Sequence, residues 1–145
     1  MKKAIYLTLT LMLLGCLTAC GFNVNVNNAV NAKAESAPKV EEMMQALTEN
    51  RLADAKVLMH PQVAEKSEAA LAQVSDYLDG RNADSIEPIN VSVNTSTGTS
   101  GKARQEQMVY QVALPDGVTV FLNVVYLSDD AGSGFASFQL VLGVV

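Results

Sequence analysis

The hydrophobic residues of this chain recur at two spacings, first every three or four residues and later every second residue. From residue 38 to residue 80 the spacing is helical, and it predicts helices over residues 38–50, 52–59 and 61–80. Asn50 and Gly80 suit the ends of the first and third helices, since both residue types tolerate the left-handed conformation. His60 ends the second helix, because a residue that precedes proline disfavours the helical conformation.

Beyond residue 80 the chain alternates between apolar and polar residues, as half-buried strands do. We expect four strands, at residues 86–93, 107–114, 118–127 and 135–142, and the third of them departs from this alternation. The stretches between them are rich in turn residues and predict a hairpin loop over 94–101 and turns at 114–118 and 129–134. Helices followed by four strands in meander order predict an α+β domain over residues 38–145, with the helices on one face of an antiparallel sheet.

The third predicted strand is apolar on both faces. Val120, Leu122 and their even-numbered neighbours form one face, while Phe121, Val125 and Leu127 make the other face apolar as well. A strand of this kind is usually covered on both sides, whereas the helices can cover only one. We therefore expect the second face to be covered by the curl of the sheet, by a second copy or a partner protein, or by a lipid-like ligand.

Composition draws attention to the N-terminus. The chain is 49% hydrophobic and only 17% charged, below the roughly 25% charged residues of an average soluble protein. Residues 1–19 contain 13 hydrophobic residues and no acid, and they begin with Lys2 and Lys3. The apolar run over residues 4–14 is shorter than the about 20 residues of a membrane span. It is typical of a cleaved export signal.

The segment Leu17-Thr18-Ala19-Cys20 resembles the lipobox of bacterial lipoproteins. The resemblance implies cleavage after Ala19, a diacylglyceryl group on the Cys20 thiol and an acyl chain such as palmitate on the new N-terminus. Several acyl chains anchor a protein stably to a membrane, whereas one chain does so only marginally. Gly21 after the cysteine implies sorting to the outer membrane, on its periplasmic side. Two alternatives are lipidation at Cys16 and an ordinary signal that leaves Cys20 as a free thiol.

Residues 20–37 follow this signal and are rich in asparagine and alanine, which predicts a flexible tether. An alternative is a short strand over residues 22–27, where apolar residues and asparagine alternate. Without residues 1–19 the chain has 8 basic and 15 acidic residues, a formal charge of −7. An acidic domain repels phosphate backbones, so we expect no binding to nucleic acid. The domain itself contains no cysteine and therefore no disulfide or thiol nucleophile.

The order of elements resembles the nuclear transport factor two-like (cystatin-like) fold, shared by several families of small bacterial lipoproteins of unknown function. Residues 40–63 resemble its opening helical unit, and residues 109–127 resemble its central hairpin. The resemblance implies a cone-shaped roll, in which the helices pack into a strongly curved sheet. Many of these families carry a tryptophan in the last hairpin, and here residues 134–138 have none. The fold hosts enzymes, binding domains and dimerisation modules, so it implies no single activity.

Candidate chemistry is sparse, and we expect no catalytic, cofactor-binding or metal site. His60 is the one histidine and suits a helix cap or a surface position. Asp129 and Asp130 lack the alternating ligand spacing of a calcium loop. The pattern places no acid at an inward-facing position of the second, third or fourth strand. The set that an isomerase of this fold would use is Tyr77, Tyr110 and Tyr126 with Asp76 or Asp79, but buried tyrosines with a hydrogen-bonded hydroxyl are the ordinary explanation of this pattern.

The sequence therefore predicts a non-enzymatic, lipid-anchored envelope protein. Its domain would bind a second copy or an envelope protein through the sheet face that carries Phe121, Val125 and Leu127. The alternative is a carrier or sensor that holds a small apolar ligand in the cone. An isomerase-like enzyme is the least favoured reading, because no general base is placed near the tyrosines.

Overall fold

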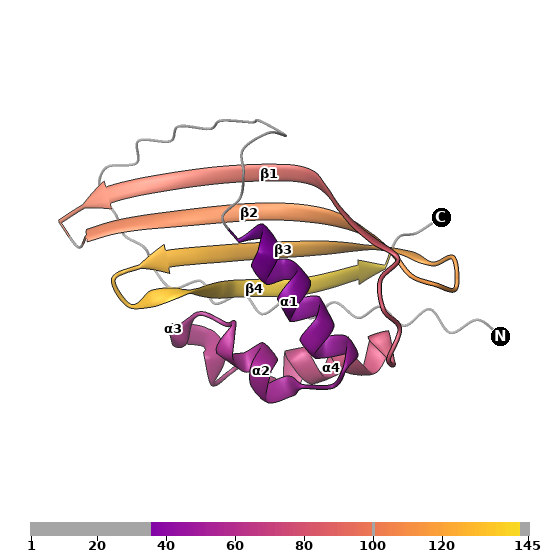
Figure 1. Cartoon of the computed structure of the whole chain (residues 1–145). Helices are drawn as coiled ribbons and strands as arrows, with labels where there is room; N and C mark the ends of the chain where they lie inside the picture. The colour runs from indigo at the N-terminus through magenta and orange to yellow at the C-terminus, as the bar shows by residue number, and fades with distance from the viewer. Residues whose placement is uncertain (1–35, 100, 143–145) are drawn as a thin grey trace.

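The computed structural model describes residues 36–99 and 101–142 (Figure 1). The predicted signal, both cysteines, the strand at 22–27 and all but the end of the tether lie outside the described residues. The elements follow in the order α1 (Ala37–Thr48), α2 (Leu52–Val57), α3 (Pro61–Ala64), α4 (Glu68–Leu78), β1 (Ser85–Gly98), β2 (Gly101–Ala113), β3 (Thr119–Asp129) and β4 (Gly132–Leu142). None of the helices in the described part of the chain is long and apolar enough to span a bilayer.

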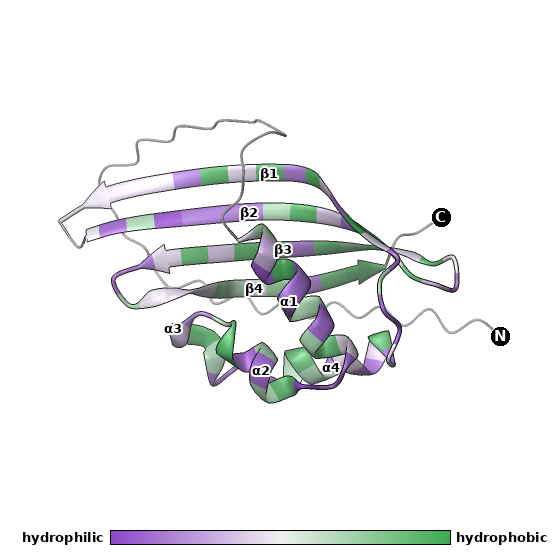
Figure 2. Cartoon of the chain, viewed as in Figure 1, coloured by the Kyte–Doolittle hydropathy of each residue, from purple (hydrophilic) through white to green (hydrophobic). Residues whose placement is uncertain are grey.

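The four strands form one open antiparallel sheet in the order β1-β2-β3-β4, and the helices lie against one of its faces (Figure 1). The prediction of an α+β domain with helices on a four-stranded meander is therefore confirmed. Apolar and polar residues alternate along β2, as the bands of Figure 2 show, whereas along β3 it is burial that alternates, between buried and half-buried residues. This alternation gives the sheet one apolar face, which packs on the helices and forms the core.

The core lies between this face and α1, α2 and α4. Val40, Met43 and Leu47 of α1 are fully buried, as the helical pattern predicts. The strands contribute in-register pairs to the same core, namely Met108–Val124, Tyr110–Leu122 and Val112–Val120. Asn50 follows α1 with a φ of 56°, so the prediction that it ends this helix is confirmed.

The prediction of a single helix over residues 61–80 is wrong, because the chain forms two helices there. The hydroxyl of Ser67 donates to the carbonyl oxygen of Ala64 at 2.8 Å and ends α3. The amide of Leu71 then bonds to the carbonyl oxygen of Ser67 at 2.9 Å and opens α4. The spacing of the apolar residues is compatible with one continuous helix, so the break depends on a side-chain bond that periodicity does not report.

The predicted hairpin loop over residues 94–101 is also wrong. β1 continues to Gly98 and β2 begins at Gly101, with Asn94 paired to Gln105 and Thr97 to Lys102. The turn is also shorter than the one predicted over residues 129–134, because the ladder between β3 and β4 reaches residues 129 and 132. Backbone pairing accounts for both differences, since ladder bonds do not require apolar side chains and threonine favours strands.

Candidate functional site on the open face of the sheet

One face of the sheet carries no helix of the described residues, and we call it the open face. Its residues form rows across the four strands, because facing residues point to the same side. The two central rows are Asn90, Val109, Asn123 and Gln139, and Ser92, Gln107, Val125 and Ser137. The flanking rows are Glu87, Gln111, Phe121 and Val141, and Asn94, Gln105, Leu127 and Gly134. Amide, hydroxyl and apolar side chains therefore mix on this face.

The three residues proposed from the sequence as an interface, Phe121, Val125 and Leu127, lie on the open face. All three are half-buried, because neighbouring side chains in the sheet shield their flanks. The curl of the sheet does not bury them within the described part of the chain. Val120, Leu122 and Val124, on the opposite face of the same strand, are at most 2% exposed. The apolar surplus of β3 thus lies where the helices leave it uncovered.

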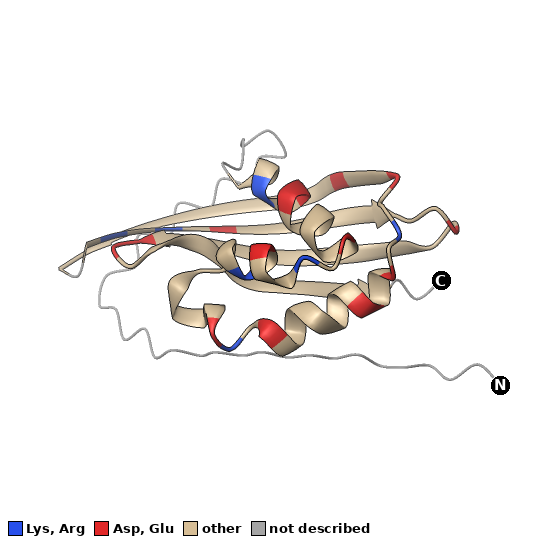
Figure 3. Cartoon of the chain, turned by 60° about the horizontal axis from the view of Figure 1, so that its bottom comes forward, with Lys and Arg blue, Asp and Glu red and all other residues tan. Residues whose placement is uncertain are grey.

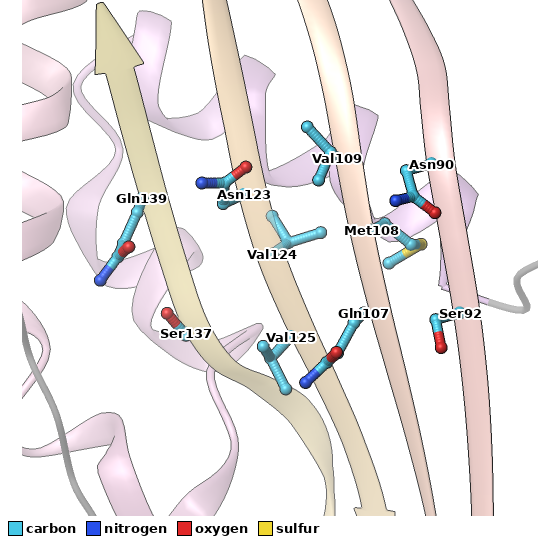
Figure 4. A pocket seen from close by; sticks show the side chains of 10 residues that line it. All are labelled: Asn90, Ser92, Gln107, Met108, Val109, Asn123, Val124, Val125, Ser137 and Gln139. Atoms are coloured by element: carbon cyan, nitrogen blue, oxygen red, sulfur yellow. The ribbon is translucent and has the colours of Figure 1, made fainter. Parts of the chain in front are cut away.

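A shallow hollow of about 260 Å³ lies over the two central rows of the open face (Figure 4). Figure 4 shows the helices behind the strands and the amide groups of Asn90, Gln107 and Asn123 beside the hollow. Val109 and Val125 lie among these amides. Asparagine and glutamine both donate and accept hydrogen bonds, so such a surface can pair with backbone groups, hydroxyls or other amides.

The open face carries almost no charge. Glu87 is the one ionisable residue in the four rows, whereas acidic and basic residues gather mainly on the helices and connecting turns (Figure 3). Burying a charge without a partner is expensive, and the centres of protein interfaces are accordingly poor in charged residues. A face of this composition can be covered by another surface at little electrostatic cost.

A buried carboxylate lies on the helix-covered face and was missed by the sequence analysis. Glu106 of β2 is 2% exposed, so the prediction that the strands carry no inward-facing acid is wrong. One of its oxygens accepts hydrogen bonds from the amide and hydroxyl of Ser36, the amide at 3.2 Å. The other accepts from Nε and Nη2 of Arg104 at 3.1 and 3.0 Å. The predicted strand began at residue 107, and extending its alternation back to Gly101 would have placed Glu106 inward.

His60 is buried and holds the start of α3 against the hairpin of β3 and β4. Its Nδ1 accepts from the amide of Gln62 at 3.3 Å, which confirms a helix cap and assigns the ring hydrogen to Nε2. Nε2 then donates to Asp129 Oδ1 at 3.0 Å. Burial raises the pKa of Asp129, but the hydrogen bonds from His60 and from the amide of Ala131 outweigh it, so this pKa lies below its usual value. Both ring nitrogens are engaged in holding the fold.

Beside the pair of His60 and Asp129, the segment before α3 and the start of β4 make close backbone contact. The amide of His60 donates to the carbonyl oxygen of Phe135 at 2.9 Å, and the amide of Phe135 donates to Leu58 at 2.9 Å. A Cβ atom on Gly134 would lie 2.5 Å from the backbone of Met59 and His60. Only glycine at position 134 lets these two segments approach so closely. The segment before α3 therefore covers part of the edge of β4.

The tyrosines of the hypothetical isomerase set have other neighbours. The hydroxyl of Tyr110 donates to the sulfur of Met108 at 3.2 Å. Burial, together with the charges of Glu106 and Glu41, raises the pKa of Tyr110 to about 12. Tyr126 packs edge-on against a phenylalanine ring, and the Tyr77 ring lies under an arginine. Asp76 and Asp79 are exposed at α4, so the structure does not bring the set together around a cavity.

Residues 36–99 and 101–142 contain no group of three histidine, cysteine or acidic side chains that could hold a metal ion. Asp129 bonds to His60, and the Asp130 side chain lies against Gly101. No family model, characterised protein or solved structure matches this chain.

Proposed function

We propose that this protein is anchored in the cell envelope by lipid on Cys20 and that its domain binds another protein chain through the open face. The observation that carries the proposal is the composition of that face. It combines uncovered apolar residues on β3 with amides and hydroxyls, and it has one ionisable residue in four rows. The remainder of an acidic domain repels a second acidic surface, so this face is the part best suited to close contact.

The lipid anchor is supported by the sequence alone. A basic start, an apolar run of 11 residues and a cysteine preceded by Leu17-Thr18-Ala19 occur in that order. We place the protein in the outer membrane with its domain in the periplasm, on the resemblance to sorted lipoproteins. The same resemblance leads us to propose kinship with the nuclear transport factor two-like fold, which is supported by helices that precede a four-stranded meander. In that fold the free face of the sheet commonly contacts a second chain.

A small apolar ligand is the weaker candidate for the hollow. Six amide or hydroxyl side chains and four apolar residues line it, and it lies open on the sheet face. A purely apolar ligand offers no hydrogen bond to the amides of Asn90, Gln107 and Asn123, and covering a polar group without satisfying it costs about 1–3 kcal/mol. A protein surface supplies both apolar groups and hydrogen-bonding groups, so it matches the hollow better.

Photo-crosslinking in intact cells tests the binding face. A photo-reactive amino acid at Val125 should give one discrete adduct, because this residue would lie inside the contact. The same amino acid at Val57 of α2, which is 81% exposed, serves as the control and should give none. An adduct of twice the chain mass identifies a second copy, and any other discrete mass identifies a different protein. Failure of positions 121, 125 and 127 to give an adduct would overturn the proposed face.

Fractionation of the same cells tests the anchor. The Cys20→Ser variant should leave the membrane fraction, because it lacks the thiol that carries the lipid. The Cys16→Ser variant should remain there as the control, since position 16 lies in the predicted signal. If Cys16→Ser releases the protein and Cys20→Ser does not, the predicted cleavage site is wrong.

A further inference from the structure

β1 is an edge strand with little to protect it. It pairs with β2 on one side only, and the order of the sheet leaves its other side without a described neighbour. From Asn90 to Gly98 the strand contains no charged residue and no proline. Glu87, Pro88 and the bulge between Pro88 and Asn90 lie at its beginning. Natural sheets usually block long free edges with charges, proline, bulges or a covering segment. The last nine residues of β1 lack the first three of these devices.

We propose that residues 22–27 of the same chain cover this edge as a fifth strand. Their sequence is Phe-Asn-Val-Asn-Val-Asn, which alternates as a half-buried strand does. β1 has the same pattern, with Val91 and Val93 on the helix-covered face and Asn90, Ser92 and Asn94 on the open face. A strand of residues 22–27 continues both faces, with its valines beside valines and its asparagines beside the amide rows. Matched pairs of this kind are what stabilises neighbouring strands.

The position of Ser36 makes this docking geometrically easy. Ser36 is held by Glu106 on β2, and Glu106 is the partner of Val93 on β1. Strands lie about 4.8 Å apart, so a fifth strand would lie about 10 Å from β2. The eight residues 28–35 connect the two, and a flexible segment of that length spans about 16 Å on average. The connection therefore reaches the edge without being stretched.

The length of this connection also favours residues 22–27 over a second copy of the chain. A short flexible connection gives its attached segment an effective concentration of about millimolar at the site. A second copy of the protein would need to reach a similar concentration to compete for the edge. Edge pairing by backbone bonds is weak for a short strand, so the covalently connected segment has the advantage.

Docking would change how the domain is held, and this consequence rests on the proposed lipid at Cys20. A free tether from residue 21 to residue 35 would let the domain move well away from the bilayer. With residues 22–27 docked, Gly21 alone separates the lipidated residue from the sheet. The β1 edge would then face the membrane, and the open face would stand beside it at a fixed angle.

Hydrogen exchange of the full chain, purified in detergent, tests the proposal. About half of the amides of an edge strand point away from its one neighbour and exchange quickly unless they are covered. Amides within 90–98 should therefore be protected in the parent chain. They should exchange about tenfold faster in a variant that combines Val24→Asp with Val26→Asp, because an equilibrium that favours docking by that ratio is abolished. The control combines Ala29→Asp with Val30→Asp, which adds the same charge within the connection, and should behave as the parent.

Equal exchange of residues 90–98 in the parent and both variants would overturn the proposal. Protection that rises with protein concentration and persists in the Val24→Asp, Val26→Asp variant would also overturn it, since a second copy would then occupy the edge. The readout depends neither on lipid at Cys20 nor on the open face. Failure here is therefore distinct from failure of the crosslinking and fractionation experiments.

Discussion

Replacing Glu106 by alanine should destabilise the domain severely, although this residue lies in neither proposed contact. The substitution removes the acceptor of four hydrogen bonds, two from Ser36 and two from Arg104. Ser36 is fully buried, so its amide and hydroxyl cannot turn to water. An unsatisfied buried group costs about 1–3 kcal/mol. The side chain of Arg104 is 35% exposed and can regain water, which limits its share of the loss.

The expected total for Glu106→Ala is about 3 kcal/mol, at the lower end of the range for breaking a buried ion pair. A domain of this size has a total stability of about 5–15 kcal/mol. Urea unfolding, followed by circular dichroism, should show the loss as a midpoint lowered by about 1–3 M, with an unchanged slope. A changed slope would mean that the variant alters the compactness of one of the two states.

Three further variants make this experiment decisive, namely Glu87→Ala, Ser36→Ala and the combination of Glu106→Ala with Ser36→Ala. Glu87→Ala is the matched control, because Glu87 is exposed on the neighbouring strand, and it should shift the stability by no more than about 0.5 kcal/mol. Combining Glu106→Ala with Ser36→Ala should show a coupling of about 1 kcal/mol or more, since the two residues share hydrogen bonds. A Glu106→Ala variant as stable as the Glu87→Ala control would refute the reasoning.

Three other predictions concern the remaining buried groups. Gly134→Ala should destabilise the domain by about 1–3 kcal/mol or more, because its Cβ would lie 2.5 Å from the backbone at His60; thermal unfolding equal to the parent's would contradict this. Asp129 has a lowered pKa in the fold, so it contributes stability above its unfolded pKa near 3.8 and loses it as the pH falls through the folded pKa. Asp129→Asn should consequently flatten the fall in urea midpoint as the pH drops below the unfolded pKa near 3.8, and an unchanged slope against pH would exclude this contribution. Tyr110 should ionise near pH 12 in the folded chain. The stability that its raised pKa contributes to the fold is present below the unfolded pKa of 10 and is lost as the pH rises through 12. A tyrosinate absorbance step near pH 12 should therefore be absent from Tyr110→Phe.

The sequence predicts those parts of the fold that depend on local periodicity. The helical spacing of Val40, Met43 and Leu47 and the alternation of β2 and β3 follow directly from which side chains must be buried. The hydrophobic pattern does not predict where an element ends when a polar contact or backbone pairing determines its boundary. Ser67 divides one apolar stripe between two helices, and backbone pairing alone extends β1 through a run of threonine and serine.

The open face was only partly predictable. Alternation along β3 places Phe121 and Val125 on the face away from the core. The rows that join them to residues of other strands depend on the register, and bulges shift it at Pro88 and at Val125. The contact between His60 and Asp129 joins positions 69 residues apart, and no local sequence pattern predicts a contact of this kind.

The contact between Ser36 and Glu106 also limits when the domain can fold during its synthesis. The two residues are separated by 70 positions, and α1 leaves the ribosome long before β2 does. Closing a segment of that length carries an entropic penalty that must be met before the contact forms. Until β2 and β3 have been synthesised, Met43 and Leu47 have no sheet to pack against. The apolar face of α1 therefore stays uncovered by the sheet until β2 and β3 have been made, and α1 is one of the segments that a holding chaperone would bind.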